Sequence, residues 1–366
     1  MNTINPKNER IKRDYFRFQT QAKQKSQATL AGIKKAIHRF EVYQNFKDFI
    51  TFNKEQAIAF KKNLSQQKAI RTAEPLSKST ALSTLNALKE FFIWLAWQPG
   101  YKSKIHVPDI EYFNLTEKEE SIARSSQLKD FPTIEQIRKV IFSMPTETVV
   151  QRRDRALIAF TILTGMRDAA IASIRIKHID LNKDPILVSQ NPDQVNTKFS
   201  KQMFTHFFPV GDDIKNIFIE WMRELKQDLL FSQNDPVFPK TTLVQDENHT
   251  FKANGVESYC WSNASPIRYI FKAAFENCGL PYFSPHRFRN TLVQIGQQNC
   301  KTPEEFKAWS QSLGHESTMT TFNSYGYIDT YKQGEVIKKI GLKNDQENME
   351  EMIRELYEMN IKNKKA

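Results

Sequence analysis

The chain has 366 residues, which is long for one domain and favours two. Lys and Arg number 53 against 41 Asp and Glu, giving a formal net charge of +12 at pH 7. No apolar run approaches the ~20 residues that cross a bilayer, and the basic N-terminus lacks the apolar stretch of a secretory signal. The composition therefore excludes an integral membrane protein and favours a cytoplasmic one.

Basic side chains are most concentrated at the start of the chain, where residues 1–50 hold eleven Lys or Arg and four Asp or Glu. A surface of this kind suits a polyanion such as nucleic acid. A solvated basic surface without such a partner has the same composition, so charge alone only favours nucleic acid.

Apolar residues recur at helical spacing in several segments of the N-terminal region, which predicts a bundle of four or five short helices over residues 1–120. The clearest helix runs from Ala81 to Leu95. Ser79 or Thr80 is a plausible cap, and the helix should end before Pro99.

A charged stretch with few apolar residues follows, and it predicts a linker that we place at residues 121–131. A second domain then begins at residue 132, where Thr133 caps a new helix and Glu135 lies in its first turn. We place the end of this domain at residue 345.

The second domain mixes helices with a small amount of strand, so the fold class is mainly α with a small β-sheet. The segment Ala156–Leu163 is apolar nearly all round, which predicts a buried helix that Gly165 can end. Residues 185–189 and 204–210 are β-rich and flank a polar stretch, which predicts a hairpin. Further helices are expected at 214–230, 264–278, 288–299 and 303–312.

Residues that could bind phosphate follow in the same domain. Arg167, in the run Thr-Gly-Met-Arg, comes just after the buried helix, whose packing would fix its position. Lys198 lies in the polar tip of the hairpin, from which a lysine can reach into a DNA groove, and Lys201 is close behind. Taken alone, each of these residues is more often a solvated surface cation.

The run Ser-Pro-His-Arg-Phe-Arg is more specific, because Pro285 suits a helix start and the i, i+3 spacing puts His286 and Arg289 on one helix face. A helix with a solvated basic edge is the alternative. Leu-Gly-His then brings His315, which by itself could be a packed or capping residue, and Tyr325 follows ten residues later.

In this order and with these contexts, the motifs resemble those of tyrosine recombinases, the group that contains phage integrases and Xer-type recombinases. The resemblance covers roughly residues 130–330. The Thr-Gly-Met-Arg run resembles the first arginine box, Lys198 the hairpin lysine, Pro-His-Arg-Phe-Arg the H-x-x-R box, and Leu-Gly-His with the later tyrosine the closing box. The N-terminal helices resemble the family's core-binding domain, which implies a C-shaped clamp on DNA.

The chain departs from the family pattern at two places. Family members commonly carry an acidic residue three positions after the first arginine, whereas this chain has Ala170, with Asp168 nearer. The nucleophile usually lies nine residues after the closing histidine, a position that Ser324 occupies here. Tyr325 is the assigned nucleophile, and Tyr327 stays open as the alternative.

The resemblance implies a phosphoryl-transfer site without a cofactor. Arg167 and Arg289 would neutralise the scissile phosphate, and His315 would add a hydrogen bond to it. His286 would accept the proton of Tyr325, and Lys198 would protonate the leaving 5′-oxygen. The 3′-phosphotyrosyl product preserves the bond energy, so resealing would need no ATP.

Sequence motifs for metals and nucleotides are missing, in agreement with that expectation. The chain has no GxxxxGK phosphate loop and no HExxH run. Its three cysteines, Cys260, Cys278 and Cys300, fit neither a disulfide framework nor a CxxC metal knuckle, and we expect buried thiols.

The expected partner is double-stranded DNA, with a homotetramer on synapsed sites, possible accessory DNA-bending proteins and no membrane. The expected setting is the cytoplasm of a bacterium, near the nucleoid, with a bacterial or phage origin. Two other functions stay open: DNA relaxation of the topoisomerase IB type, and DNA binding by a decayed enzyme. The tail, residues 346–366, has an amphipathic pattern and would pack on its own domain or on a neighbouring subunit.

Overall fold

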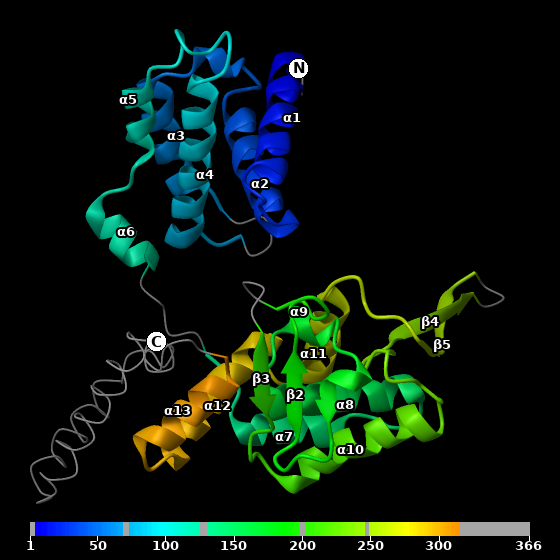
Figure 1. The fold of residues 1–366 in the computed structure, drawn as a ribbon. Helices are drawn as coiled ribbons and strands as arrows, with labels where there is room; N and C mark the ends of the chain where they lie inside the picture. The colour runs from blue at the N-terminus through cyan, green and yellow to red at the C-terminus, as the bar shows by residue number, and fades with distance from the viewer. Residues whose placement is uncertain (1–3, 69–72, 125–129, 198–201, 246–248, 315–366) are drawn as a thin grey trace, which may run out of the picture. The chain divides into compact units, whose positions relative to one another are not determined.

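The computed structural model describes residues 4–68, 73–124, 130–197, 202–245 and 249–314. The chain forms two compact units that divide between Ser126 and Gln127, and each unit is described by itself (Figure 1). The expected amphipathic tail at 346–366 lies outside the described residues.

The N-terminal unit is a bundle of helices, as the apolar periodicity predicts. Its α-helices are α1 (Pro6–Gln21), α2 (Gln27–Tyr43), α3 (Lys54–Gln66), α4 (Lys78–Ala96), α5 (Val107–Ile110) and α6 (Glu117–Arg124), with 3-10 turns η1 (Phe49–Thr51) and η2 (Glu111–Phe113). The cap of α4 is Ser77, whose side chain accepts the Thr80 N–H, so the expectation of Ser79 or Thr80 was wrong by two or three residues. Several hydroxyl residues in a row offer alternative caps, and the first of them is used.

Phenylalanine rings fill the core of this unit. Phe52 stacks on Phe92 with 4.0 Å between ring centroids, and Phe40 meets Phe92 edge-on at 5.3 Å. Helix α6 extends into the predicted linker, of which it covers residues 121–124, and an ion pair of 3.1 Å between Lys78 and Glu119 joins the helix to the start of α4.

The second unit holds most of its helices within a few residues of the predicted bounds. They are α7 (Ile134–Ser143), α8 (Val149–Thr164), α9 (Asp168–Ile171), α10 (Asp212–Gln227), α11 (Ser265–Asn277), α12 (Phe288–Asn299) and α13 (Pro303–Ser312), with 3-10 turns η3 (Ile176–His178) and η5 (Pro285–Arg287). Thr133 caps α7 as predicted, through a capping box with Gln136. Helix α8 is buried along its apolar segment, which confirms that prediction.

A small antiparallel sheet lies beside these helices, in the strand order β1-β2-β3. The strands are β1 (Ile179–Asp180), β2 (Leu187–Gln190) and β3 (Met203–His206), and Val188 of β2 pairs with Thr205 of β3. The predicted hairpin is therefore present, but β3 ends before the expected residue 210. After His206 the chain enters the core, where the Phe208 N–H donates to the Leu163 carbonyl at 2.7 Å.

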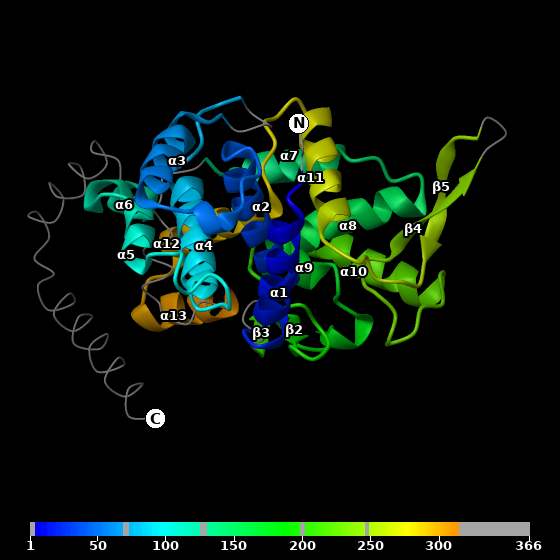
Figure 2. The same cartoon turned by 90° about the horizontal axis from the view of Figure 1, so that it is seen from above.

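A second hairpin was not predicted. It consists of β4 (Lys240–Gln245) and β5 (Phe251–Glu257), and both views show it extending away from the rest of its unit (Figures 1 and 2). Arg153 of α8 holds its base, donating to the Pro239 carbonyl and to the Thr241 hydroxyl at 2.8 Å each.

Two further expectations bear on surfaces. No helix among the described residues is long and apolar enough to cross a membrane. Cys260, Cys278 and Cys300 are free thiols, but each is only partly buried rather than buried as expected. Cys278 and Cys300 are the C-cap residues of α11 and α12, and Cys260 lies between β5 and α11.

Candidate active site

Arg167 is placed by a tight turn at the end of α8. Gly165 ends that helix with φ of 60°, a left-handed conformation that suits glycine. A Cβ added at this residue would lie 2.9 Å from side-chain carbons of both Leu292 and Leu313, so the turn is packed closely against α12 and the end of α13. Arg167 then caps α9, because its carbonyl accepts the Ala170 N–H at 2.9 Å. The packing of a buried helix end thus fixes the backbone of this arginine.

Arg289 comes from the first turn of α12 and is buried, with only 5% of its surface exposed. Its guanidinium donates to the carbonyl of Gly165 at 2.7 Å and to that of Leu313 at 2.5 Å. One side chain therefore joins α12 to the end of α8, 124 residues earlier in the sequence, and to the end of α13, 24 residues later. Loss of hydration, and then the nearby charge of Arg167, lower the pKa of Arg289 to about 9, so it still carries its proton at neutral pH.

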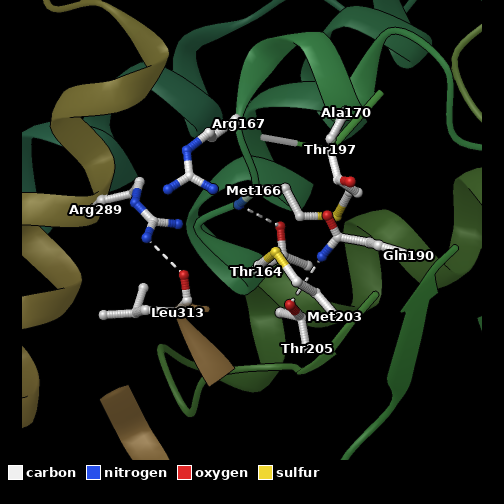
Figure 3. Close-up of a pocket in the computed structure, with 10 residues that line it drawn as sticks. All are labelled: Thr164, Met166, Arg167, Ala170, Gln190, Thr197, Met203, Thr205, Arg289 and Leu313. Atoms are coloured by element: carbon white, nitrogen blue, oxygen red, sulfur yellow. Dashed lines mark hydrogen bonds between the residues drawn. The ribbon is translucent and has the colours of Figure 1, made fainter. Parts of the chain in front are cut away.

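The two guanidiniums meet at one pocket, and Figure 3 shows them side by side although they come from different helices. Loss of hydration also lowers the pKa of Arg167. Two cations held this close favour an anion between them or in front of them. The rest of the lining is Thr164, Met166, Ala170, Gln190, Thr197, Met203, Thr205 and Leu313.

His286 lies in η5, which begins at Pro285 and leads into α12. The ring remains exposed at the edge of the site, whereas Arg289 is buried. Partial loss of hydration, and then the charges of Arg289 and Arg167, lower the pKa of His286. The imidazole is therefore neutral at pH 7 and able to accept a proton. The helix expected to start at Pro285 is a 3-10 turn followed by α12, so His286 precedes the α-helix that carries Arg289.

Four predicted residues fall outside the described part of the chain: Lys198, Lys201, His315 and Tyr325, together with the alternatives Ser324 and Tyr327. The described segments that lead to two of them end at the pocket. Thr197 lines the pocket, and the Leu313 carbonyl accepts from Arg289. Gly314 has φ of 69°, which strains any other residue, and a Cβ there would lie 1.8 Å from the terminal methyl of Met203, so that side chain would have to move.

Sequence reasoning missed several residues around the site. Asp168 pairs with Arg268 of α11 at 2.7 Å, a contact across a hundred residues that no local motif indicates. Gln190 donates to the Thr205 hydroxyl at 3.0 Å, which in turn donates to the Ser312 carbonyl at 3.0 Å. The sequence predicted the hairpin, but neither the burial of these two side chains nor the chain of hydrogen bonds that they form. Within the described ranges, no three His, Cys, Asp or Glu side chains gather as metal ligands would.

Comparisons with known proteins identify the family of the chain. The sequence model of the phage integrase family matches residues 133–330. Tyrosine recombinase XerC of Lactobacillus delbrueckii subsp. bulgaricus is 22% identical over 254 residues, which are 69% of this chain and 73% of that protein.

Solved structures resemble the chain over a larger share of its length. XerH recombinase bound to palindromic difH substrate aligns with a TM-score of 0.58 at 17% identity, covering 84% of this chain and 78% of that one. A lambda integrase(75–356) dimer bound to a COC′ core site gives 0.56 at 12% identity, covering 87% and 95%. The Tn1549 transposon integrase in complex with transposon right end DNA gives 0.56 at 12%, covering 91% and 98%. At these identities the likeness concerns the fold.

Proposed function

Because this chain belongs to the phage integrase family of tyrosine recombinases, we propose that it is a site-specific recombinase that cuts and rejoins DNA through a 3′-phosphotyrosyl intermediate. One observation carries the proposal furthest. Arg167 and Arg289, from motifs 122 residues apart in the sequence, bring their guanidiniums to one pocket beside the Leu313 carbonyl of the third motif. Two cations held side by side at a partly buried site repel each other and destabilise the fold. Binding of an anion such as a phosphate would offset that cost.

The proposed reaction is an attack of the Tyr325 hydroxyl on the scissile phosphorus. The new bond joins the tyrosine oxygen to phosphorus, and the bond from phosphorus to the 5′-oxygen breaks. The tyrosine proton passes to His286, whose lowered pKa supports that role, and Lys198 protonates the leaving 5′-oxygen. Arg167 and Arg289, with His315, stabilise the charge on the non-bridging oxygens. A 5′-hydroxyl reverses these steps when the strand is rejoined.

The proposed substrate is double-stranded DNA, which both units would contact as a C-shaped clamp. A groove between α1 and α2 is lined by basic side chains, among them Arg13, Lys34 and Lys35. Among the solved relatives, XerH is bound to palindromic difH substrate, a lambda integrase dimer is bound to a COC′ core site, and the Tn1549 integrase is bound to transposon right end DNA. Assembly as a homotetramer on synapsed sites, accessory DNA-bending proteins and a cytoplasmic, nucleoid-associated setting belong to the same proposal.

The clamp has its own test. Removing residues 1–126 should weaken DNA binding and flatten its salt dependence, since each lost phosphate contact removes roughly one unit of slope in a plot of log affinity against log salt. A truncated protein with an unchanged slope would show that the N-terminal unit makes no phosphate contacts.

Covalent trapping tests the chemistry and the nucleophile together. The protein would be incubated with a duplex library that has a randomised centre and a nick, so that the released 5′-hydroxyl fragment diffuses away. We expect a protein–DNA adduct that survives denaturant, with the nucleotide on the peptide that contains Tyr325. An adduct on Tyr327 or Ser324 would reassign the nucleophile. If no adduct forms, although the protein binds the library, strand cleavage is wrong and DNA binding by a decayed enzyme stands.

A topoisomerase IB-like activity uses the same chemistry without a second DNA site. Sites recovered from the trapped adducts would be placed on one plasmid, either singly or in pairs. Exchange of markers between paired sites supports recombination. Relaxation of the single-site plasmid with no exchange would favour the topoisomerase.

A further inference from the structure

The chain just before Lys198 is held at several points, although it leaves the sheet after β2. Val195 is only 1% exposed, and its N–H donates to the Asn191 carbonyl at 2.8 Å. The Asn196 N–H donates to the hydroxyl of Ser173 at 2.9 Å. Thr197 then lines the pocket of the two arginines. Residues 191–197, which we call the lysine-loop stem, are therefore fixed up to the edge of the site.

Ser173 makes contacts on two sides. Its Oγ donates to the Ala170 carbonyl at 3.1 Å, just past the middle of the short helix that Arg167 caps. The same Oγ accepts from the Asn196 N–H. A hydroxyl has one proton to give and lone pairs to accept with, so both bonds form at once. One side chain thus joins backbone three residues after Arg167 to backbone two residues before Lys198.

His178 supplies a second anchor for the lysine-loop stem. Its Nδ1 accepts the Arg175 N–H at 3.0 Å, which leaves the proton on Nε2. Nε2 then donates to the Gln194 Oε1 at 3.0 Å. Loss of hydration lowers the pKa of His178, which keeps the ring in this neutral form. The stem is held by two independent side chains, and both come from the segment directly after α9.

We propose that Ser173 is a positioning residue that sets the place of the Lys198 amine relative to Arg167 and the scissile phosphate. The inference rests on the proposed function, in which Lys198 protonates the leaving oxygen. A proton donor on a loop acts only when it is held near its target, and a displacement of 1 Å costs as much as 10²-fold in rate. The Ser173 hydroxyl, two residues after the end of the helix that Arg167 caps, provides that restraint.

The experiment compares two leaving groups. On DNA with the natural 5′-oxygen at the cleavage site, Ser173→Ala should slow strand cleavage by roughly tenfold or more, up to the ~10²–10⁴-fold that a general acid contributes. On the same DNA with sulfur in place of that bridging oxygen, the leaving thiolate needs no proton, because a thiol has a pKa near ~8.5. The variant should then cleave at nearly the wild-type rate. A loss of general folding would slow both substrates alike.

Matched variants separate the hydroxyl from side effects. Ser173→Thr keeps a hydroxyl and should cleave both substrates near the wild-type rate. Gln194→Met removes the acceptor for His178 and should reproduce the leaving-group difference more weakly, whereas Gln194→Glu keeps an acceptor and should not. Gln194 is exposed, so these two variants should fold even if Ser173→Ala does not.

Each outcome has a meaning. Equal slowing of Ser173→Ala on both substrates, or no slowing on either, overturns the role proposed for Ser173. Lys198→Ala sets the reference: if sulfur does not restore its cleavage, Lys198 is not the proton donor and the inference falls with that assignment. Wild-type protein that forms no adduct with either substrate would instead overturn the proposed function itself.

Discussion

The aromatic core of the N-terminal unit and the surroundings of the arginine pocket are held together by different forces. In the first, the rings of Phe40, Phe52 and Phe92 contact one another with no polar group between them. Around the pocket, the buried side chains of Arg289 and Gln190 are fixed by hydrogen bonds instead. Ring contacts are tolerant of direction, whereas hydrogen bonds fix particular atoms. The ring contacts therefore contribute mainly to the stability of the N-terminal unit. The hydrogen bonds around the pocket instead hold particular side chains in fixed positions.

The largest effect on stability should come from opening the aromatic core. Phe92→Ala leaves a cavity among rings that are fully buried, and we expect a loss of about 3–5 kcal/mol in the N-terminal unit. Hydrogen exchange measured by mass spectrometry would resolve the two units separately. The second unit should be unchanged. Ile93→Ala, on the exposed side of α4, is the control and should cost about 1 kcal/mol or less. Equal losses for both variants would contradict the importance of the ring cluster.

The two arginines should separate chemistry from structure. Arg167→Ala should lower strand cleavage by ~10²-fold or more, the cost of one lost oxyanion donor, with little change in stability. Arg289→Met should lower cleavage as well and also destabilise the second unit, because the Gly165 and Leu313 carbonyls lose a buried donor at about 1–3 kcal/mol each. Cleavage rates and urea unfolding would be measured on both variants. Equal stability of the two would show that the Arg289 hydrogen bonds matter little.

A smaller effect is expected where α12 and α13 cross. A Cβ added at Gly296 would lie 2.6 Å from the Nε1 atom of Trp309, which donates to the Leu292 carbonyl at 2.9 Å. Gly296→Ala should therefore destabilise the second unit by about 1–3 kcal/mol, as overpacking does. Gly32→Ala is the matched control, because nothing lies within 4 Å of a Cβ there and the residue is inside α2. That change should stabilise the N-terminal unit by roughly 0.5–1 kcal/mol. Thermal unfolding of both variants gives the comparison.

The smallest effect concerns pH. The pKa values of His178 and His286 are both lowered in the folded protein. In the unfolded chain both histidines have a pKa of about 6.5, so below that pH the unfolded chain binds more protons than the folded protein. Stability of the second unit should therefore be fully present above that pH and fall as the pH drops through about 6.5 toward the folded values. Each histidine contributes at most about 1.4 kcal/mol per pH unit. Urea unfolding at pH 7.5 and pH 5.5 measures the slope, which His178→Asn should reduce. A second unit that gains stability on acidification would refute this reading.

The sequence predicts some elements well because their patterns are periodic. Helices α4 and α8 repeat apolar residues along many turns, so their positions follow directly from spacing. The β4–β5 hairpin has no such signal, because residues such as Leu243 and Phe251 are exposed and no alternation with a buried face exists. Strand patterns are readable only where one side packs on a core.

The candidate site was predicted in part for a similar reason. Arg167, His286 and Arg289 stand in local motifs, and Arg167 and Arg289 line one pocket in the structure. The acceptors of Arg289 are backbone carbonyls, which have no side-chain signature in a sequence. The partner of Asp168 lies a hundred residues away and is known only once α11 is placed beside α9.

The two hydrogen bonds from Arg289 to Gly165 and Leu313 also constrain how a gene of this kind can decay. The planar guanidinium of arginine reaches both carbonyls at once. A lysine has one compact ammonium group, and an apolar side chain has no donor. Once selection for DNA rearrangement is lifted, substitutions at Arg167 would leave a folded product, but substitutions at Arg289 would lower the amount of folded protein in the cell. An inactive copy that is still expressed should therefore lose the first arginine earlier than the second. A copy that has lost only Arg167 would then have lost its activity more recently than a copy that has lost both arginines.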